Sequence, residues 1–301
     1  MNFNFVVAIS LIGSASVTLV NAQQRNDPQF DTKIARPAFA KRHPRVLVDA
    51  AHDNAFTVQS KRADPLIQLM TNDGLTPDKA KEPFSETSLA GYDLLVILTA
   101  QGKKETTDPA FTDAEIDAVY NWVKRGGSML LCVDHSPFGP AGRKLAERFG
   151  VNVFLGTVAD SARSDRWHDD DFTPVYSRAN GDLGDHAILR GRDDSERVDK
   201  VAPFGGESLT GPKKSWNLLP VSKTAVNADN KGQPGENLGP SQAIALKSGK
   251  GRVVITGDCT MWTAQLFVYN QKEHQYGMAR TDLGDRQFAI NVIRWLTGAL
   301  K

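Results

Sequence analysis

Four short, uninterrupted apolar stretches alternate with segments of helical periodicity, and this alternation constrains the fold more than any other feature of the sequence. Such stretches suit strands that are covered on both faces, as in a parallel sheet. Parallel strands of one sheet are joined by right-handed crossovers, commonly through a helix. We therefore predict a doubly wound α/β domain with a mainly parallel sheet. Its predicted parallel strands are Arg45–Asp49, Asp93–Thr99, Ser128–Asp134 and Arg252–Asp258.

Helical periodicity is clearest in the segment Phe111–Arg125, which follows the capping-box pattern Thr112-Asp-Ala-Glu115 and ends at Gly126-Gly127. Further helices are predicted at about 57–72, 140–149 and 284–297. In the C-terminal half, strands at 217–225 and 242–246 add antiparallel members to the sheet, the second through a Ser-Gly-Lys-Gly hairpin. Segments 155–185 and 226–240 are rich in turn-forming residues and are predicted to be loops.

The N-terminal segment carries the features of an export signal. An apolar stretch from Phe5 to Val20 precedes Val20-Asn21-Ala22, which offers the small residues that signal peptidase requires. We predict a signal peptide over residues 1–22, a polar linker or arm over 23–43, and one domain over 44–301. The mature protein is then expected to be periplasmic or extracellular, without a membrane span. An uncleaved membrane anchor is the alternative.

The charge balance limits the classes of partner that we expect, and the two cysteines raise the question of a disulfide. The 36 basic and 35 acidic residues nearly balance, so no overall field draws the protein to nucleic acid or to an anionic membrane, and we expect neither as a partner. The two cysteines, Cys132 and Cys259, lie near the ends of predicted core strands. We predict buried free thiols that pack as small apolar side chains, with a disulfide as the alternative in an oxidising compartment.

Polar side chains gather where the predicted parallel strands end. In an open α/β sheet, ligands bind beyond the carboxyl ends of the strands, because helix N-termini and strand-exit loops converge there. Three of the four strands end in an aspartate, and a histidine closely follows two of these. We therefore predict a ligand site at this edge. Its candidate residues are Asp49, His52, Asn54, Gln101, Asp134, His135, Asp258, Thr260 and Trp262.

The chemistry of this edge is open between several interpretations. A carboxylate beside an imidazole suits a general base, a proton relay or a metal site, so the catalytic candidates are His52, His135 and Asp134. Strand-exit aspartates also cap helices, and core packing is the alternative role of Trp262. No His-x-x-x-His pair is present, so we predict no metal and no other cofactor, with a divalent ion as the alternative. No Gly-x-Ser-x-Gly elbow and no phosphate-binding glycine loop are present.

The order of five motifs carries a family resemblance. They are Val46-Leu-Val-Asp49-Ala-Ala-His52-Asp-Asn54, Tyr92-Asp-Leu-Leu-Val-Ile, Gly126-Gly-Ser-Met-Leu-Leu, Asp185-His186-Ala-Ile-Leu-Arg-Gly191 and Gly251-Arg-Val-Val-Ile-Thr-Gly-Asp258. Together, over about residues 44–298, they resemble the class I glutamine amidotransferase-like superfamily. The likeness is to a branch of exported bacterial domains that is also similar to the N-terminal domain of an intraflagellar transport protein, and more distantly to trehalose-utilisation-type proteins.

The resemblance implies a flavodoxin-like sheet. Amidotransferases of that superfamily carry a Gly-x-Cys-x-Gly elbow and a downstream His-x-Glu, and this sequence has neither, so the resemblance does not extend to glutaminase activity. Members of the branch often have no assigned reaction, and some are suspected of handling carbohydrate. His186 either brings a third imidazole to the edge or caps a turn, and we expect the cap.

These observations favour an exported binding domain for a polar small molecule such as a saccharide. Trp262 would offer a stacking surface and Gln101 a hydrogen-bonding amide. One alternative is a hydrolase whose Asp-His pair activates water, with or without a metal. Another is a module that binds a further envelope protein, whose identity the sequence does not indicate.

Overall fold

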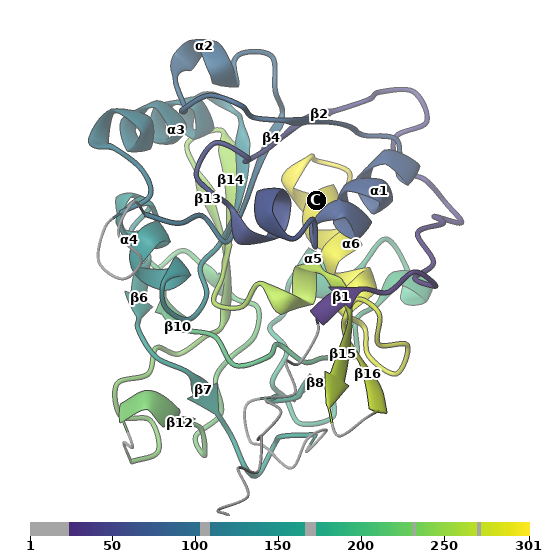
Figure 1. Cartoon of the computed structure of the whole chain (residues 1–301), viewed down its shortest axis with the longest axis vertical. Helices are drawn as coiled ribbons and strands as arrows, with labels where there is room; N and C mark the ends of the chain where they lie inside the picture. Colours follow the sequence, from purple (N-terminus) through teal and green to yellow (C-terminus); the bar gives the residue numbers. More distant parts are fainter. Residues whose placement is uncertain (1–23, 103–108, 166–172, 231–232, 270–271) are drawn as a thin grey trace, which may run out of the picture.

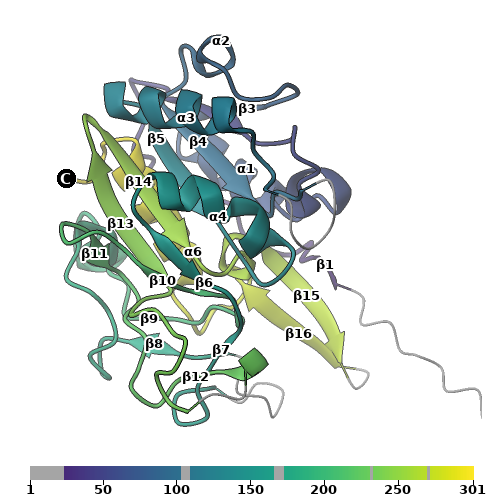
Figure 2. The same cartoon turned by 90° about the vertical axis from the view of Figure 1, so that its left-hand side faces the viewer.

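The computed structural model describes residues 24–102, 109–165, 173–230, 233–269 and 272–301. Its central element is a seven-stranded sheet with the order β11-β13-β14-β5-β4-β2-β3 (Figures 1 and 2). The five strands from β14 to β3 are parallel, and β13 and β11 extend the sheet through antiparallel pairs. The predicted mainly parallel sheet is therefore confirmed. The strands are β2 (Arg45–Val48), β3 (Thr76–Lys79), β4 (Leu94–Leu98), β5 (Ser128–Cys132), β11 (Trp216–Asn217), β13 (Ala243–Ser248) and β14 (Gly251–Thr256).

Helices cover both faces of this sheet. Helices α2 (Glu86–Leu89), α3 (Asp113–Arg125) and α4 (Phe138–Arg148) lie on one face (Figure 2). Helices α1 (Asp64–Asn72), α5 (Ala187–Arg190) and α6 (Asp285–Leu296) lie on the other (Figure 1). Strand β4 shows how the layers arise, since Leu94, Val96 and Leu98 belong to the core under α1 and α6. Leu95 and Ile97 belong to the core under α3. Because successive side chains of a strand point to opposite faces, one apolar run supplies two cores.

Most predicted elements agree with the structure. Thr112 and Glu115 form the expected reciprocal capping box at the start of α3, and Gly126 ends that helix with a φ of 131°. The hairpin between β13 and β14 is antiparallel, as the Ser-Gly-Lys-Gly turn indicated. The helices predicted at 140–149 and 284–297 correspond to α4 and α6.

Two predictions of local structure were wrong, and one strand was not predicted. The helix predicted over 57–72 is two elements, a π-helical turn at Ala55–Gln59 and α1, because the chain bends at Ser60–Ala63. The strand predicted over 217–225 is limited to the edge strand β11, since the chain then leaves the sheet. Strand β3, with the polar sequence Thr-Pro-Asp-Lys, carries no apolar run and was missed.

Shorter strands form four small sheets beside the main one. In the largest, β1 pairs with β15, and β15 with β16, all antiparallel, so that a hairpin extends from the body of the protein (Figure 2). Some of these pairs lie within segments predicted as loops. The small sheets contain β1 (Gln24–Asn26), β15 (Ala264–Tyr269), β16 (Lys272–Gly277), β6 (Asn152–Phe154), β10 (Ser208–Thr210), β7 (Val158–Ala159), β12 (Val226–Asn227), β8 (Tyr176–Ser177) and β9 (Lys200–Val201).

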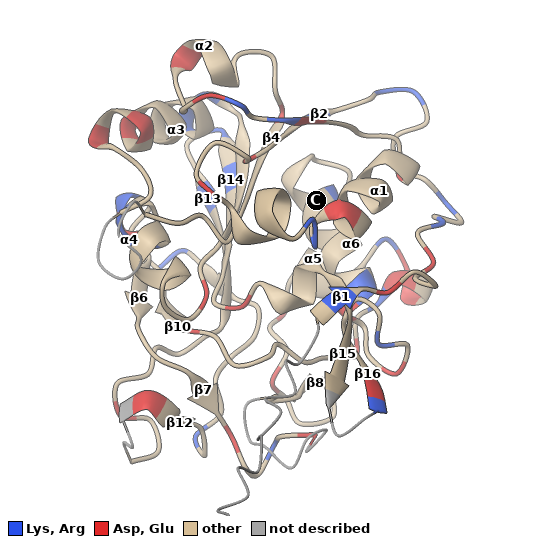
Figure 3. Ribbon diagram, viewed as in Figure 1, with Lys and Arg blue, Asp and Glu red and all other residues tan. Residues whose placement is uncertain are grey.

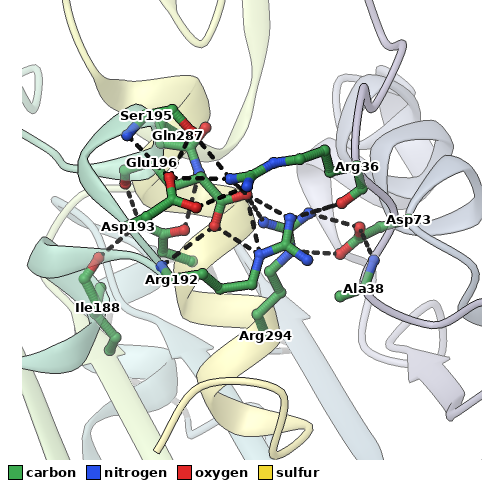
Figure 4. Close-up of polar contacts among 11 residues, drawn as sticks. Arg36, Ala38, Asp73, Ile188, Arg192, Asp193, Ser195, Glu196, Gln287 and Arg294 are labelled. Atoms are coloured by element: carbon green, nitrogen blue, oxygen red, sulfur yellow. Dashed lines mark hydrogen bonds and ion pairs between the residues drawn. The ribbon is translucent and has the colours of Figure 1, made fainter.

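Residues 24–43, which we call the arm, lie along the domain in an extended course. Side chains of α1, α6 and the residue after α1 hold their backbone at several points. Asn72 donates to the carbonyl of Thr32, and Asp73 accepts from the amide of Ala38. Arg294 donates to the carbonyl of Arg36 (Figure 4). Residues 24–43 of the segment predicted as a linker or arm are thus hydrogen-bonded to the domain.

The two cysteines form a disulfide that joins the ends of β5 and β14. Cys132 and Cys259 have Cα atoms 5.7 Å apart, and both side chains are buried. The prediction of free thiols was wrong because the separate strand positions did not show that the two strand ends are neighbours. Cys132 pairs with Thr256 in the sheet, and the turn after β14 returns Cys259 to the same place.

No helix among the described residues is long and apolar enough to cross a membrane. The predicted signal peptide, residues 1–22, lies outside the described residues.

Candidate functional site

The order of the parallel strands reverses between β2 and β4, and we call this place the switch point. Taken in chain order, the five parallel strands have the flavodoxin order 2-1-3-4-5, in which ligands bind at the carboxyl ends of the first and third strands. Those two strands here are β2 and β4. Their exits are in direct contact, because the amide of Gln101 donates to the carbonyl of His52 over 3.0 Å.

A pocket of about 440 Å³, here called the switch-point pocket, opens at this edge. His52 and Gln101 reach it from the ends of β2 and β4, and Lys144 reaches it from α4. Of the predicted site residues, His52 and Gln101 therefore line one pocket. The full lining is Ala51, His52, Asp53, Gln101, Pro109, Ala110, Phe111, Thr112, Asp113 and Lys144.

His52 lines this pocket and is fixed by two carboxylates. Its Nδ1 lies 2.8 Å from Asp49 Oδ1, and its Nε2 lies 2.8 Å from Glu115 Oε1. The ring also packs between Phe84 and Phe111, with centroid distances of 4.8 and 4.7 Å. Both ring nitrogens therefore donate to carboxylates, which is the arrangement of an imidazolium.

The charges around His52 stabilise this ionised state. Burial lowers the pKa of His52, but the hydrogen bonds and charges of Asp49 and Glu115 outweigh burial and raise it. Burial likewise raises the pKa of Glu115, but hydrogen bonds from Thr112, His52 and Phe84 outweigh it and lower that pKa. The two carboxylates therefore hold the His52 ring in one orientation and favour its protonated form.

Asp49 and Asn54 do not line the pocket but stabilise the strand exits beside it. Asn54 is fully buried, and its amide donates to Asp49 Oδ2 and to the carbonyl of Leu98 at 3.0 Å. Thr99, which follows β4, has a φ of 46°, unusual for a β-branched residue. Its hydroxyl accepts from the amide of Phe56. These bonds fix the two strand exits relative to each other.

A second group of candidates lies at the ends of β5 and β14. His135 is half-exposed, and its Nδ1 lies 2.8 Å from Asp134 Oδ1. Asp134 is buried and also accepts from the amide of Cys259. The hydrogen bond that His135 donates to Asp134 outweighs burial and raises the pKa of His135. Asp134 therefore orients an imidazole whose other face meets solvent.

Buried carboxyl groups lie beneath this pair. We call Asp134, Asp258 and Glu207 the acid cluster. Burial and then the charge of Asp134 raise the pKa of Asp258 to about 8 and that of Glu207 to about 9. Glu207 packs against Gly139, where any Cβ would lie 2.0 Å from the carboxylate. Burial thus favours the protonated form of Asp258 and Glu207 near neutral pH.

The remaining predicted residues have structural positions. Trp262 is fully buried, and its Nε1 donates to Thr256 Oγ1 at 3.0 Å. It therefore packs in the core and presents no surface on which a ligand could stack. Thr260 lies beside Asp258 and lowers its pKa through a hydrogen bond. His186 caps α5 by accepting from the amide of Ile188, which confirms the expected turn cap. Burial lowers the pKa of His186 to about 4.

No family model matches this chain, and no curated protein sequence matches it. Among solved structures, the mmIFT52 N-terminal domain superposes with a TM-score of 0.59 at 16% identity, over 84% of this chain and 97% of that domain. The chain shares that domain's fold. The predicted similarity to an intraflagellar transport domain is thereby confirmed at the level of the fold.

Two bacterial structures are also similar at lower scores. A ThuA-like protein from Bacteroides uniformis has a TM-score of 0.45 at 14% identity, over 87% of this chain and 93% of that chain. A cytoplasmic protein from Salmonella typhimurium has a TM-score of 0.47 at 13% identity, over 85% and 98% of the two chains.

Three residues at or near the candidate site were missed in the sequence. Glu115 was read only as the end of a capping box, although its second oxygen reaches His52. Lys144 lies in a predicted helix that carries no motif, and Glu207 follows the pair Gly205-Gly206 and belongs to no motif. Only the capping-box glutamate gave a sequence signal. Within the described ranges, no three His, Cys, Asp or Glu side chains converge as metal ligands would.

The acid cluster leads to a prediction about pH. Because the folded-state pKa values of Glu207 and Asp258 lie above those of the unfolded chain, the folded state retains protons that the unfolded state releases. The free energy of unfolding should therefore fall as the pH rises from about 4 to about 9. Each of the two groups contributes up to about 1.4 kcal/mol per pH unit to this fall. Glu207→Gln should flatten this fall, measured by urea unfolding across the pH range. Glu82→Gln, at an exposed site, is the control, and an unchanged slope in Glu207→Gln would contradict the assignment.

Proposed function

We propose that the protein is an exported domain that binds a polar small molecule, a saccharide, in the switch-point pocket. The observation that carries this proposal is the position and lining of the pocket at the exits of β2 and β4. Its volume of about 440 Å³ lies within the range of small-molecule sites.

The lining supports a ligand with many hydroxyl groups. Gln101 offers an amide, while Asp53, Asp113 and Lys144 offer carboxylates and an ammonium group. Lys144 and Asp113 form an ion pair at 2.5 Å, so their charges balance and they remain able to donate to and accept from hydroxyls. The fixed ring of His52 adds a rigid side chain to the lining, and a rigid lining reduces the ordering cost of binding.

The disulfide supports the exported part of the proposal. Disulfides persist in oxidising compartments and are rare in reducing ones. Both cysteines are used in this bond, so neither supplies the thiolate that a glutaminase needs. We therefore assign the domain no glutaminase activity.

Thermal unfolding against a panel of neutral saccharides tests the binding proposal. A ligand at a hundredfold excess over its dissociation constant should stabilise the protein by about 2.7 kcal/mol. Gln101→Ala should remove most of this gain without changing the stability of the ligand-free protein. Gln68→Ala, at an exposed position on α1, is the matched control. If no saccharide stabilises the wild type, or if Gln101→Ala responds fully, the proposed site is wrong.

A second candidate function is hydrolysis at His135. The half-exposed imidazole held by Asp134 has the geometry of an oriented general base. Hydrolysis of p-nitrophenyl glycosides and esters should then be measurable in the wild type. His135→Ala should abolish it while keeping the unfolding temperature, whereas turnover that survives this substitution would exclude the role.

A further inference from the structure

A second cavity, of about 550 Å³, lies between the arm and α6 and shares no residue with the switch-point pocket. Lys33 and Arg36 line it from the arm, and Arg286, Gln287 and Arg294 line it from α6 (Figure 4 shows Arg36, Gln287 and Arg294). Acidic and basic residues are otherwise interspersed along the ribbon (Figure 3). We call this cavity the arm cavity.

Two of its arginines are neutralised by carboxylates. Arg294 contacts Asp73 at 2.7 Å and Glu196 at 2.9 Å, and both partners are buried. Arg36 contacts Asp193 at 2.6 Å and Glu196 at 3.1 Å (Figure 4). These guanidinium groups hold the arm in place, and their charges are already balanced.

Arg286 and Lys33 differ from them. Arg286 donates to the backbone carbonyls of Asp31 and Lys33, at 3.1 and 2.5 Å, and forms no ion pair with a described carboxylate. Burial lowers the pKa of Arg286, against a weaker opposite effect from the charge of Asp31. Lys33 is exposed and likewise has no ion pair within the described part of the chain. A partly buried guanidinium without a bonded carboxylate gains free energy when an anion binds.

We propose that the arm cavity binds a small molecule through an oxyanion, either a carboxylate or a phosphate, with Arg286 as the main ligand and Lys33 as a second cation. The planar guanidinium matches the oxygens of both groups and can bind them in a bidentate manner. Ser195 and Gln287 line the same cavity and can hydrogen-bond to the rest of the molecule. The volume is sufficient for an acidic or phosphorylated sugar.

Calorimetric titration of the full chain at constant ionic strength tests this site with three probes: glucuronate, glucose 6-phosphate and glucose. The first two distinguish a carboxylate from a phosphate ligand, and glucose lacks an oxyanion. We expect at least one anionic probe to bind. Arg286→Gln should lower the affinity for that probe by about tenfold or more, because one charged hydrogen-bonding partner is lost. Lys41→Gln, the same change of charge at an exposed position of the arm, should leave the affinity unchanged.

Further variants keep the test decisive. Lys33→Gln changes an exposed side chain and should also weaken binding of the anion, while Gln101→Ala, in the switch-point pocket, should not. If Arg286→Gln fails to fold, Arg286→Lys keeps the charge but loses the planar fork and should still bind more weakly than the wild type. The proposal is overturned if neither anion binds at millimolar concentration, or if binding survives the substitutions at Arg286 and Lys33. Either result leaves the saccharide test at the switch-point pocket unaffected.

Discussion

Replacing Arg294 with methionine is expected to lower the free energy of unfolding by about 3–5 kcal/mol, the usual cost of removing one partner from a buried ion pair. The guanidinium is 2% exposed and binds Asp73 through two hydrogen bonds, of 2.8 and 2.7 Å. Methionine fills similar space but leaves Asp73 and Glu196 buried without this cation. The loss can be measured by urea unfolding monitored through tryptophan fluorescence.

The same substitution should release the arm. Asp73 accepts from the amide of Ala38, and Arg294 donates to the carbonyl of Arg36, so both ends of the pair hold arm backbone (Figure 4). Limited proteolysis should cut the arm faster in Arg294→Met than in the wild type. Arg42→Met removes an exposed ion pair to Asp93 and should cost less than about 1 kcal/mol. Equal stability losses for the two variants would show that the buried pair does not anchor the arm.

Loss of the disulfide should have an effect of similar size. The bond closes a loop with a sequence separation of 127 residues, for which chain entropy predicts a stabilisation of about 4–5 kcal/mol. The double variant Cys132→Ala, Cys259→Ala should therefore unfold at a markedly lower urea concentration than the oxidised wild type.

Reduction of the wild type with dithiothreitol provides an independent measurement. It should lower the unfolding midpoint of the wild type toward that of the double variant and leave the variant unchanged. An oxidised and a reduced wild type of equal stability would mean that the thiols are not joined in solution.

The sequence predicts the central sheet because each parallel strand is an uninterrupted apolar run between two cores. Leu94–Leu98 is the clearest example, since all five residues are buried. The β15–β16 hairpin could not be predicted in this way. Strand β16 has the polar sequence Lys-Glu-His-Gln-Tyr-Gly, and it is ordered as a strand by pairing with β15 and not by its own pattern.

The candidate site was predictable in position but not in detail. Strand exits indicated where His52 and Gln101 would meet, because parallel strands end at one edge of the sheet. The partner that fixes the charge of His52 is Glu115, which lies 63 positions later, and no local pattern connects the two. For the same reason, the sequence could not distinguish a stacking role of Trp262 from the core position that it occupies.

The pairing of β1 with β15 has a consequence for the order of folding. Gln24 lies opposite Phe267, so β1, the first described strand, can pair only after β15, one of the last strands, has been synthesised. Contacts between such distant positions carry a high cost of loop closure and form slowly. During synthesis, β1 therefore stays unpaired until β15 has emerged. This interval leaves β1 accessible to other factors before it pairs with β15.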